Sequence, residues 1–196
     1  NCNCLFCYHK GNLNGFTPKL SDVIARIDKM LALGIIFFEI TGGEALLRKD
    51  LIEIITHLNR CRVHYILVTN GEYLQNASDN LLDILRSSHG VLISIDGIGL
   101  RHDFVRQRAG LFKQIIKGLE RLKQGGVNIF FNSTLYAGNI EDVPEMIQLA
   151  RYHNTSIQLR PVIQTTAIKE NHLRAVPFTG ALNQLLQSTN VHSAFA

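Results

Sequence analysis

The chain has 196 residues, of which 46% are hydrophobic and 18% charged, and its mean hydropathy is +0.08. A chain of this length and apolar content can bury a core, which excludes an intrinsically disordered protein. The 20 Lys and Arg outnumber the 16 Asp and Glu, but these basic residues are scattered singly or in pairs, a pattern too weak for a nucleic-acid-binding surface.

The longest nearly unbroken apolar stretch, 30–38, is about half of the roughly 20 residues that a membrane helix needs, so we expect no membrane association. The first residues lack the features of a signal peptide and do not begin with Met, so we expect a segment of a longer protein. Three of the 4 cysteines crowd into the first seven residues, a spacing more typical of metal ligands than of a disulfide scaffold. Because metal-binding thiolates must stay reduced, we expect a cytoplasmic location.

Strand and helix patterns alternate along the chain. Apolar residues at helical spacing predict a first helix near 18–33, which ends at Gly34. Short β-branched and aromatic runs predict strands at 35–40, 65–69, 91–95, 129–135 and 157–159, and helical patterns begin near Leu51, Leu81, Leu111 and Val143. The unit repeats at roughly 30 residues, the length of a strand with its crossover helix. We therefore expect an α/β fold with parallel strands, either an open doubly wound sheet or a barrel.

Polar residues follow each of these predicted strands. In such folds, ligands collect at the carboxyl ends of the strands. Each group taken alone is typical of an ordinary turn, but together they predict one ligand-binding rim. The groups are 41–44, 69–71, 94–97, 132–134 and 160–161.

Cys4 and Cys7 form a C-x-x-C motif, which suits a redox pair, half of a zinc site or part of an iron–sulfur site. A redox pair is disfavoured because residues 9–15 read as a loop rather than as a helix. A closed zinc site needs four ligands, and Cys2, Cys4 and Cys7 have no obvious fourth, although His9 could complete the set.

This cysteine pattern resembles the signature of the radical S-adenosylmethionine (radical SAM) family, C-x3-C-x2-C followed by an aromatic residue. Cys4, Cys7 and Tyr8 match the second cysteine, the third cysteine and the aromatic residue. The first cysteine would lie one residue before Asn1, and the family's first barrel strand would precede it. Cys2 falls at a position that is not a ligand in the family. The resemblance implies that Cys4 and Cys7 bind iron and that Tyr8 lies beside the cofactors.

A second segment, Gly42, Gly43 and Glu44, resembles the family's Gly-Gly-Glu-Pro stretch, with Ala45 in place of the proline. In the family this stretch holds the amino group of SAM, because glycines allow close backbone approach and the glutamate accepts from an ammonium. The loss of proline removes rigidity but no hydrogen-bonding group.

The region after the strand predicted at 91–95 resembles the peptide-modifying and cofactor-maturing (SPASM-type) branch of the family. The resemblance implies that Arg106 pairs with the SAM carboxylate. It also implies that Ser94 and Asp96 face the ribose or the substrate, and that Asn132 makes a ribose or carboxylate contact.

The resemblance further implies a partial (β/α)6 TIM-like barrel over 1–161, followed by an extension over 162–196 with one helix near Leu182, Leu185 and Leu186. It implies an oxidoreductase or maturase that uses a [4Fe-4S] cluster and SAM. We expect a peptide or small-molecule precursor as substrate and a reductase or a ferredoxin-type protein as electron donor. One alternative is a non-catalytic remnant that binds zinc or SAM without radical chemistry. Another is a plain α/β domain whose cysteine-rich start is incidental.

Other chemistry-bearing residues have simpler interpretations. We expect His57 and the other scattered histidines to be surface or packing residues, and Cys61 to be a small half-buried apolar residue. Asp103 is expected to orient Arg106 or to cap the next helix, with His102 beside it in a polar loop.

Overall fold

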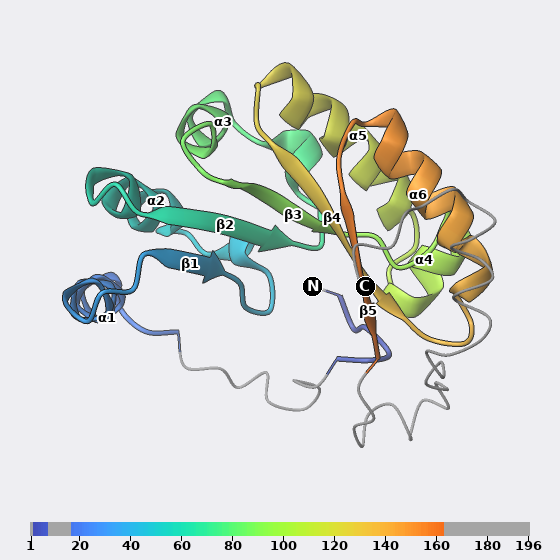
Figure 1. Ribbon diagram of the computed structural model, residues 1–196, viewed down its shortest axis with the longest axis horizontal. Coiled ribbons are helices and arrows are strands. Elements are labelled where there is room, and N and C mark those ends of the chain that lie inside the picture. The colour runs from blue at the N-terminus through green and yellow to red at the C-terminus, as the bar shows by residue number, and fades with distance from the viewer. Residues whose placement is uncertain (1, 8–16, 163–196) are drawn as a thin grey trace, which may run out of the picture. The chain divides into compact units, whose positions relative to one another are not determined.

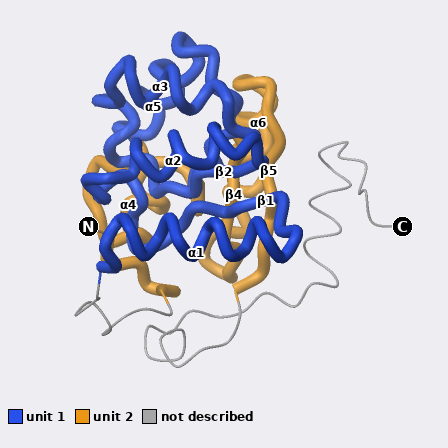
Figure 2. The backbone as a smooth tube through the Cα atoms, turned by 90° about the vertical axis from the view of Figure 1, so that its left-hand side faces the viewer, with its two compact units in different colours: residues 1, 11–94, 113–129 blue, residues 2–10, 95–112, 130–196 orange. Residues whose placement is uncertain are grey.

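The computed structural model describes residues 2–7 and 17–162, and Figure 1 shows their helices and strands. These residues form two compact units, which Figure 2 colours separately. The first unit contains residues 17–94 and 113–129, and the second contains residues 2–7, 95–112 and 130–162.

Strands and helices alternate as the sequence predicts. The strands lie in the order β1-β2-β3-β4-β5, and the β1–β2, β2–β3 and β4–β5 pairs are parallel. Parallel neighbours need a crossover connection, and helices supply it here. The predicted α/β class with parallel strands is therefore confirmed. The elements are α1 (Leu20–Ala32), β1 (Phe37–Ile40), η1 (Ala45–Leu47), α2 (Leu51–Arg60), β2 (His64–Thr69), η2 (Leu74–Asn76), α3 (Asp79–Leu85), β3 (Gly90–Ser94), α4 (Leu100–Arg106), α5 (Leu111–Gln124), β4 (Ile129–Leu135), η3 (Ile140–Asp142), α6 (Val143–Tyr152) and β5 (Ile157–Pro161).

Two local differences from the predicted elements have physical causes. The first strand begins at Phe37 rather than at Ile35, because the Ile35 N–H donates to the Met30 carbonyl and so completes the end of α1. Helix α4 was not predicted. It is seven residues long, and its apolar residues Leu100 and Phe104 are exposed, so the sequence carries no helical apolar stripe there.

The core of the first unit lies between the strands and helices α2, α3 and α5. All five residues of β3 are buried, as expected for a strand covered on both faces. Helix α1 contributes much less, because Ile27 is its one buried residue. The other helical core side chains of this unit come from α2 (Leu51, Ile54, Ile55, Leu58), α3 (Leu82, Leu85) and α5 (Ile115, Leu119, Leu122).

Close packing requires a glycine at position 71, in the turn after β2. Its φ is +85°, and a Cβ there would lie 2.7 Å from Cγ1 of Ile115 and 3.3 Å from Cγ2 of Ile93. Only glycine combines that backbone conformation with that contact. Gly71 therefore lets the turn after β2 pack against α5 and β3 in the first unit.

The boundary predicted at residue 161 stays a prediction, and the helix expected near Leu182 lies outside the described residues. Within residues 2–7 and 17–162, no helix combines the length and the apolar character needed to span a lipid bilayer.

We expect Gly71→Ala to lower the free energy of unfolding by about 1–3 kcal/mol, because the new methyl group meets Ile115 and strains the backbone. Gly43→Ala is the matched control. A Cβ at Gly43 would meet no atom within 4 Å, so its cost should stay below about 0.5 kcal/mol. Urea denaturation of the two variants measures both values, and equal losses would contradict the packing role of Gly71.

Candidate functional site

The carboxylate of Glu44 joins the ends of β1 and β2 in the first unit. Its Oε1 accepts hydrogen bonds from Thr69 Oγ1 at 2.7 Å and from the Leu46 N–H at 3.1 Å. Its Oε2 accepts from the Asn70 N–H at 2.8 Å. A carboxylate has about four acceptor positions, so these three bonds leave room for another donor. Glu44 is thus held in one orientation and can still accept from an ammonium group.

A hollow of about 780 Å³ lies beside this loop in the first unit. Gly42 and Gly43 border it, and a Cβ on either residue would meet no atom within 4 Å. Packing among the described residues therefore does not require glycine at these positions. The bare backbone leaves room for a ligand to approach closely. The lining residues are Thr17, Pro18, Thr41, Gly42, Gly43, Glu44, Ala45, Leu47, Arg48, Lys49, Asp50 and Glu53.

Ala45 occupies the position where the resembling motif has proline, and the turn keeps its shape through hydrogen bonds. The Leu47 N–H donates to the Glu44 carbonyl at 3.2 Å, and the Arg48 N–H donates to the Ala45 carbonyl at 3.0 Å. Ala45 is itself buried. Packing and two backbone hydrogen bonds therefore hold this turn without a proline ring.

In the second unit, Cys4 and Cys7 lie at the two ends of a tight turn. The Cys7 N–H donates to the Cys4 carbonyl at 3.1 Å, and the Leu5 N–H donates to the Val105 carbonyl of α4 at 2.9 Å. Both cysteines are free thiols. Leu5 and Phe6 also pack against a cluster made of Val105, Tyr136 and Val162. The cysteine segment is thus anchored to α4 by one backbone bond and by apolar contacts.

The surroundings of Cys4 favour its thiolate form. A hydrogen bond with the Cys2 side chain lowers the pKa of Cys4 most, burial opposes this, and the charge of Arg106 lowers the pKa further, to about 6. Nη1 of Arg106 donates to the Cys4 sulfur at 3.6 Å. At neutral pH Cys4 is therefore mostly ionised, the form in which a thiol binds a metal ion.

Arg106 forms a buried ion pair with Asp96. Its Nε and Nη2 both donate to Oδ2 of Asp96 at 2.5 Å, and the two residues are 8% and 0% exposed. Burial opposes the charge of Arg106, but Asp96 and then Cys4 outweigh it and raise the pKa of Arg106. The guanidinium also lies 5.2 Å from the centre of the Phe6 ring. These contacts leave two of its five N–H groups for another acceptor.

Three residues hold Asp96 in place. Its Oδ1 accepts from the Thr134 N–H at 2.7 Å, its own N–H donates to Nδ1 of His102 at 3.0 Å, and its carbonyl accepts from Nδ2 of Asn139 at 2.9 Å. His102 is fully buried on α4, so the expectation of a polar loop there was wrong. Burial, followed by the charge of Arg106, lowers the pKa of His102 to about 3, so its ring is neutral.

Sequence reasoning missed the roles of His102, Thr134 and Asn139. Each of these residues forms a hydrogen bond with Asp96 across a long or irregular stretch of chain, and no spacing along the sequence predicts such a bond. The sequence offered a partial signal at His102, because this residue directly precedes Asp103, which lies shortly before the helix predicted to begin near Leu111.

The other predicted residues lie in different surroundings. Asp103 accepts hydrogen bonds from the Gly110 N–H at 2.6 Å and the Phe112 N–H at 2.8 Å, which confirms that it caps the next helix, α5. Ser94 is buried at the end of β3 in the first unit. Asn132 lies on β4, and its Oδ1 is buried without a hydrogen-bond partner among the described residues. Tyr8 lies outside the described residues.

We expect the wild-type chain to lose stability as the pH falls from 6 to 4, with a contribution from His102 of up to about 1.4 kcal/mol per pH unit. The folded state keeps the pKa of His102 at about 3, against 6.5 in the unfolded chain, so only the unfolded chain gains that proton in this interval. His102→Gln should flatten the dependence, and His64→Gln, at an exposed site, should not. Urea denaturation at several pH values measures the slopes. Parallel slopes for wild type and His102→Gln would refute the assignment.

Residues 1–150 of the sequence match the family model of the Radical SAM superfamily. A Pyrococcus abyssi protein named "Probable GTP 3',8-cyclase" is 29% identical over 161 residues, which cover 81% of this chain and 52% of that protein. The sporulation killing factor maturation protein SkfB of Bacillus subtilis is 27% identical over 150 residues, which cover 76% of this chain and 36% of SkfB. The chain thus spans about half or less of the length of these relatives.

Solved structures show the same fold. Streptococcus suis SuiB bound to S-adenosylmethionine has a TM-score of 0.69 at 15% identity, over 85% of this chain and 39% of SuiB. SuiB bound to its precursor peptide SuiA has a TM-score of 0.70 at 14% identity, over 81% of this chain and 36% of SuiB. The expected partial TIM-like radical SAM fold and the likeness to peptide-modifying members are therefore confirmed. This chain is a member of the radical SAM superfamily.

Proposed function

We propose that this protein binds a [4Fe-4S] cluster through Cys4 and Cys7, cleaves SAM reductively and abstracts a hydrogen atom from a peptide or a small cofactor precursor. The main support is the buried group of Asp96, Arg106 and Cys4. It stabilises a thiolate in a chain whose superfamily generally uses SAM and a four-iron cluster.

The residues of the second unit suit a cluster. Cys4 and Cys7 lie at the ends of one hydrogen-bonded turn, and Cys4 is mostly thiolate at neutral pH. When bound, the cluster supplies the electron that breaks a carbon–sulfur bond of SAM. Arg106 keeps positive charge beside the Cys4 sulfur. Tyr8 follows this pair in the sequence and is proposed to lie beside the bound cofactors.

Each unit, taken by itself, carries polar groups that suit part of SAM. In the first unit, Glu44 accepts from the amino group, and the backbone of Gly42 and Gly43 allows the ligand to approach closely. In the second unit, the two remaining N–H groups of Arg106 bind the carboxylate, and Asp96 positions them.

We assign the ribose hydroxyls to Asn132 and Ser94. The buried Asn132 Oδ1 supports this assignment, because a ligand hydroxyl would give it the hydrogen bond that the described residues do not. Asp96 acts on the ribose or substrate only through the residues that it positions, since its carboxylate is fully buried against Arg106 and Thr134.

The names of the relatives support two substrate classes. SkfB is named as a maturation protein, SuiB is seen with a precursor peptide, and a Methanosarcina barkeri relative is named Fe-coproporphyrin III synthase. A peptide is therefore the first substrate class to test and a cofactor precursor the second. The electron is proposed to come from a reductase or a ferredoxin-type protein.

One observation favours a second candidate, a zinc-binding remnant without radical chemistry. The Cys2 side chain hydrogen-bonds to Cys4, which brings a third thiol to the turn. Zinc in structural sites takes up to four such ligands. The two proposals differ in the role of Cys2, since it is a zinc ligand in the remnant and is not a cluster ligand in the radical SAM enzyme.

We expect the protein with its native residues before Asn1 restored, reconstituted anaerobically with iron and sulfide, to show the broad visible absorption of thiolate-bound iron and, once reduced with dithionite, to convert SAM to 5′-deoxyadenosine. The chain that begins at Asn1 should assemble the cluster poorly. Cys4→Ser and Cys7→Ser should each lower iron content and SAM cleavage. Cys2→Ser is the matched control and should retain both, since serine can still donate to Cys4. Loss of iron in all three variants, or a zinc-loaded protein without SAM cleavage, would favour the remnant.

Gly43→Ala should weaken SAM binding by about 1–3 kcal/mol, because its methyl group enters the hollow beside Glu44. Isothermal titration calorimetry of the reconstituted protein measures the affinity. The unfolding free energy of the same variant, expected to be unchanged, separates lost binding from lost structure. Wild-type affinity in Gly43→Ala would remove this loop from the SAM site.

A further inference from the structure

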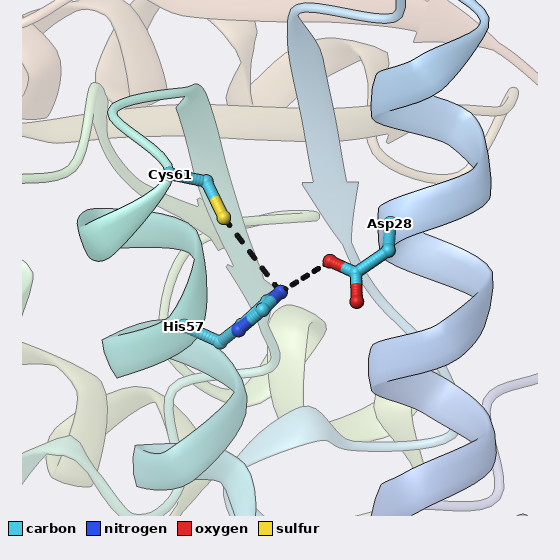
Figure 3. A group of neighbouring side chains, drawn as sticks. All are labelled: Asp28, His57 and Cys61. Carbon is cyan, nitrogen blue, oxygen red and sulfur yellow. Dashed lines mark hydrogen bonds and ion pairs between the residues drawn. The ribbon is translucent and has the colours of Figure 1, made fainter.

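Three potential metal-ligating side chains meet on the outer side of the first unit, on two helices. Asp28 lies on α1, His57 lies in the last turn of α2, and Cys61 is the C-terminal capping residue of α2. Their ligand atoms all lie within 4.8 Å of one another, the one such group of three found among the described residues. Figure 3 shows Asp28 and Cys61 approaching the same nitrogen of the His57 ring.

The contacts at this nitrogen cannot all be satisfied by one proton. Oδ1 of Asp28 lies 2.7 Å from Nε2 of His57, and Sγ of Cys61 lies 3.7 Å from the same atom. If Nε2 carries a proton, that proton serves Asp28, and Cys61 faces a donor that is already used. If Nε2 is bare, it can accept from the Cys61 thiol, but its lone pair then faces the carboxylate of Asp28. A cation between the three atoms would accept all three lone pairs at once.

We propose that Asp28, His57 and Cys61 bind a divalent cation of the zinc class, which joins α1 to α2. Sulfur, imidazole nitrogen and carboxylate oxygen are the three ligand types that zinc takes in proteins. A thiolate and a carboxylate together balance the two positive charges. With metal–ligand distances of about 2.0–2.3 Å, tetrahedral ligand atoms lie about 3.3–3.6 Å apart. The 3.7 Å separation of sulfur and nitrogen is close to this range, whereas the Asp28 oxygen, 2.7 Å from Nε2, would move away from the ring when the ion binds.

The position of the group favours a cation. His57 and Cys61 are four residues apart and so lie on one face of the chain at the end of α2, where the helix dipole is negative. The Cys61 N–H donates to the His57 carbonyl at 3.0 Å, which fixes their relative position. The side chains of His57 and Asp28 are 24% and 55% exposed, so a metal ion and a fourth ligand such as water can enter from solvent.

The site is separate from the one proposed for SAM. Helices that follow parallel strands run back along them, so the end of α2 lies near the start of β2, whereas Glu44 follows the end of β1. A metal ion bound there would stabilise the structure. Helix α1 buries only Ile27, so a link through Asp28 would add an anchor where apolar packing supplies little.

The test uses Co²⁺ as a spectroscopic probe in the full chain carrying Cys2→Ala, Cys4→Ala and Cys7→Ala, which removes the other candidate thiolate ligands. We expect one equivalent of Co²⁺ to produce a thiolate charge-transfer band, and Zn²⁺ to displace it and raise the melting temperature. Cys61→Ser should abolish the band, and His57→Gln and Asp28→Asn should each weaken Co²⁺ binding at least about tenfold. The controls His64→Gln, at an exposed histidine of β2, and Asp22→Asn, at an exposed aspartate of the same helix as Asp28, should change nothing.

A missing band in the parent, a band that survives Cys61→Ser, or an unchanged Co²⁺ affinity in His57→Gln would overturn the proposal. An unchanged Co²⁺ affinity in Asp28→Asn would show that Asp28 is not a ligand, and would refute the proposed metal link between α1 and α2. If the parent variant does not fold, zinc content is measured by mass spectrometry in the chain with its N-terminal cysteines intact. Cys61→Ser should then lower it by one equivalent, and an unchanged content would likewise refute the site.

Discussion

The second unit depends on the buried ion pair of Asp96 and Arg106. Taking two charges out of water costs several kcal/mol per ion, and such a pair persists only when the remaining hydrogen-bonding positions are filled. Here the Thr134 N–H of β4 and the Arg106 guanidinium donate to the carboxylate oxygens of Asp96. The side chains of His102 and Asn139 form hydrogen bonds with the Asp96 backbone. Removing either charge would leave the other buried and alone, at a cost of about 3–5 kcal/mol. The pair therefore sets the relative positions of α4, β4 and the cysteine turn within this unit.

A carboxylate plays a comparable part in the first unit. Glu44 binds a side chain and backbone groups from the end of β2 and from η1, and so fixes the loop that carries Gly42 and Gly43. The difference lies in what each carboxylate has left to offer. Asp96 is enclosed and acts through Arg106, whereas Glu44 borders an open hollow and keeps an acceptor position. One residue is suited to positioning and the other to direct contact with a ligand.

The alternation of strands and helices could be predicted because burial is periodic, and the fully buried β3 reads as a continuous apolar run. The candidate residues Cys4, Gly42 to Glu44 and Arg106 were singled out by their resemblance to radical SAM motifs, each of which is a short stretch of sequence. Helix α4 could not, since it buries its polar residues, among them His102 and Arg106, and exposes Leu100. The partnership of Asp28 with His57 and Cys61 also escaped prediction, because the spacing along the chain does not reveal which faces of α1 and α2 meet.

The anchoring of residues 4–7 would lower the cost of binding the proposed cluster. The backbone bond from Leu5 to Val105 and the apolar contacts of Leu5 and Phe6 restrict these residues before any ligand arrives. Ordering a residue costs roughly 1–2 kcal/mol in backbone entropy, and a preorganised segment has already met that cost during folding. In the proposed enzyme, the packing of Leu5 and Phe6 against Val105 and Val162 would therefore contribute to cluster affinity as well as to the core.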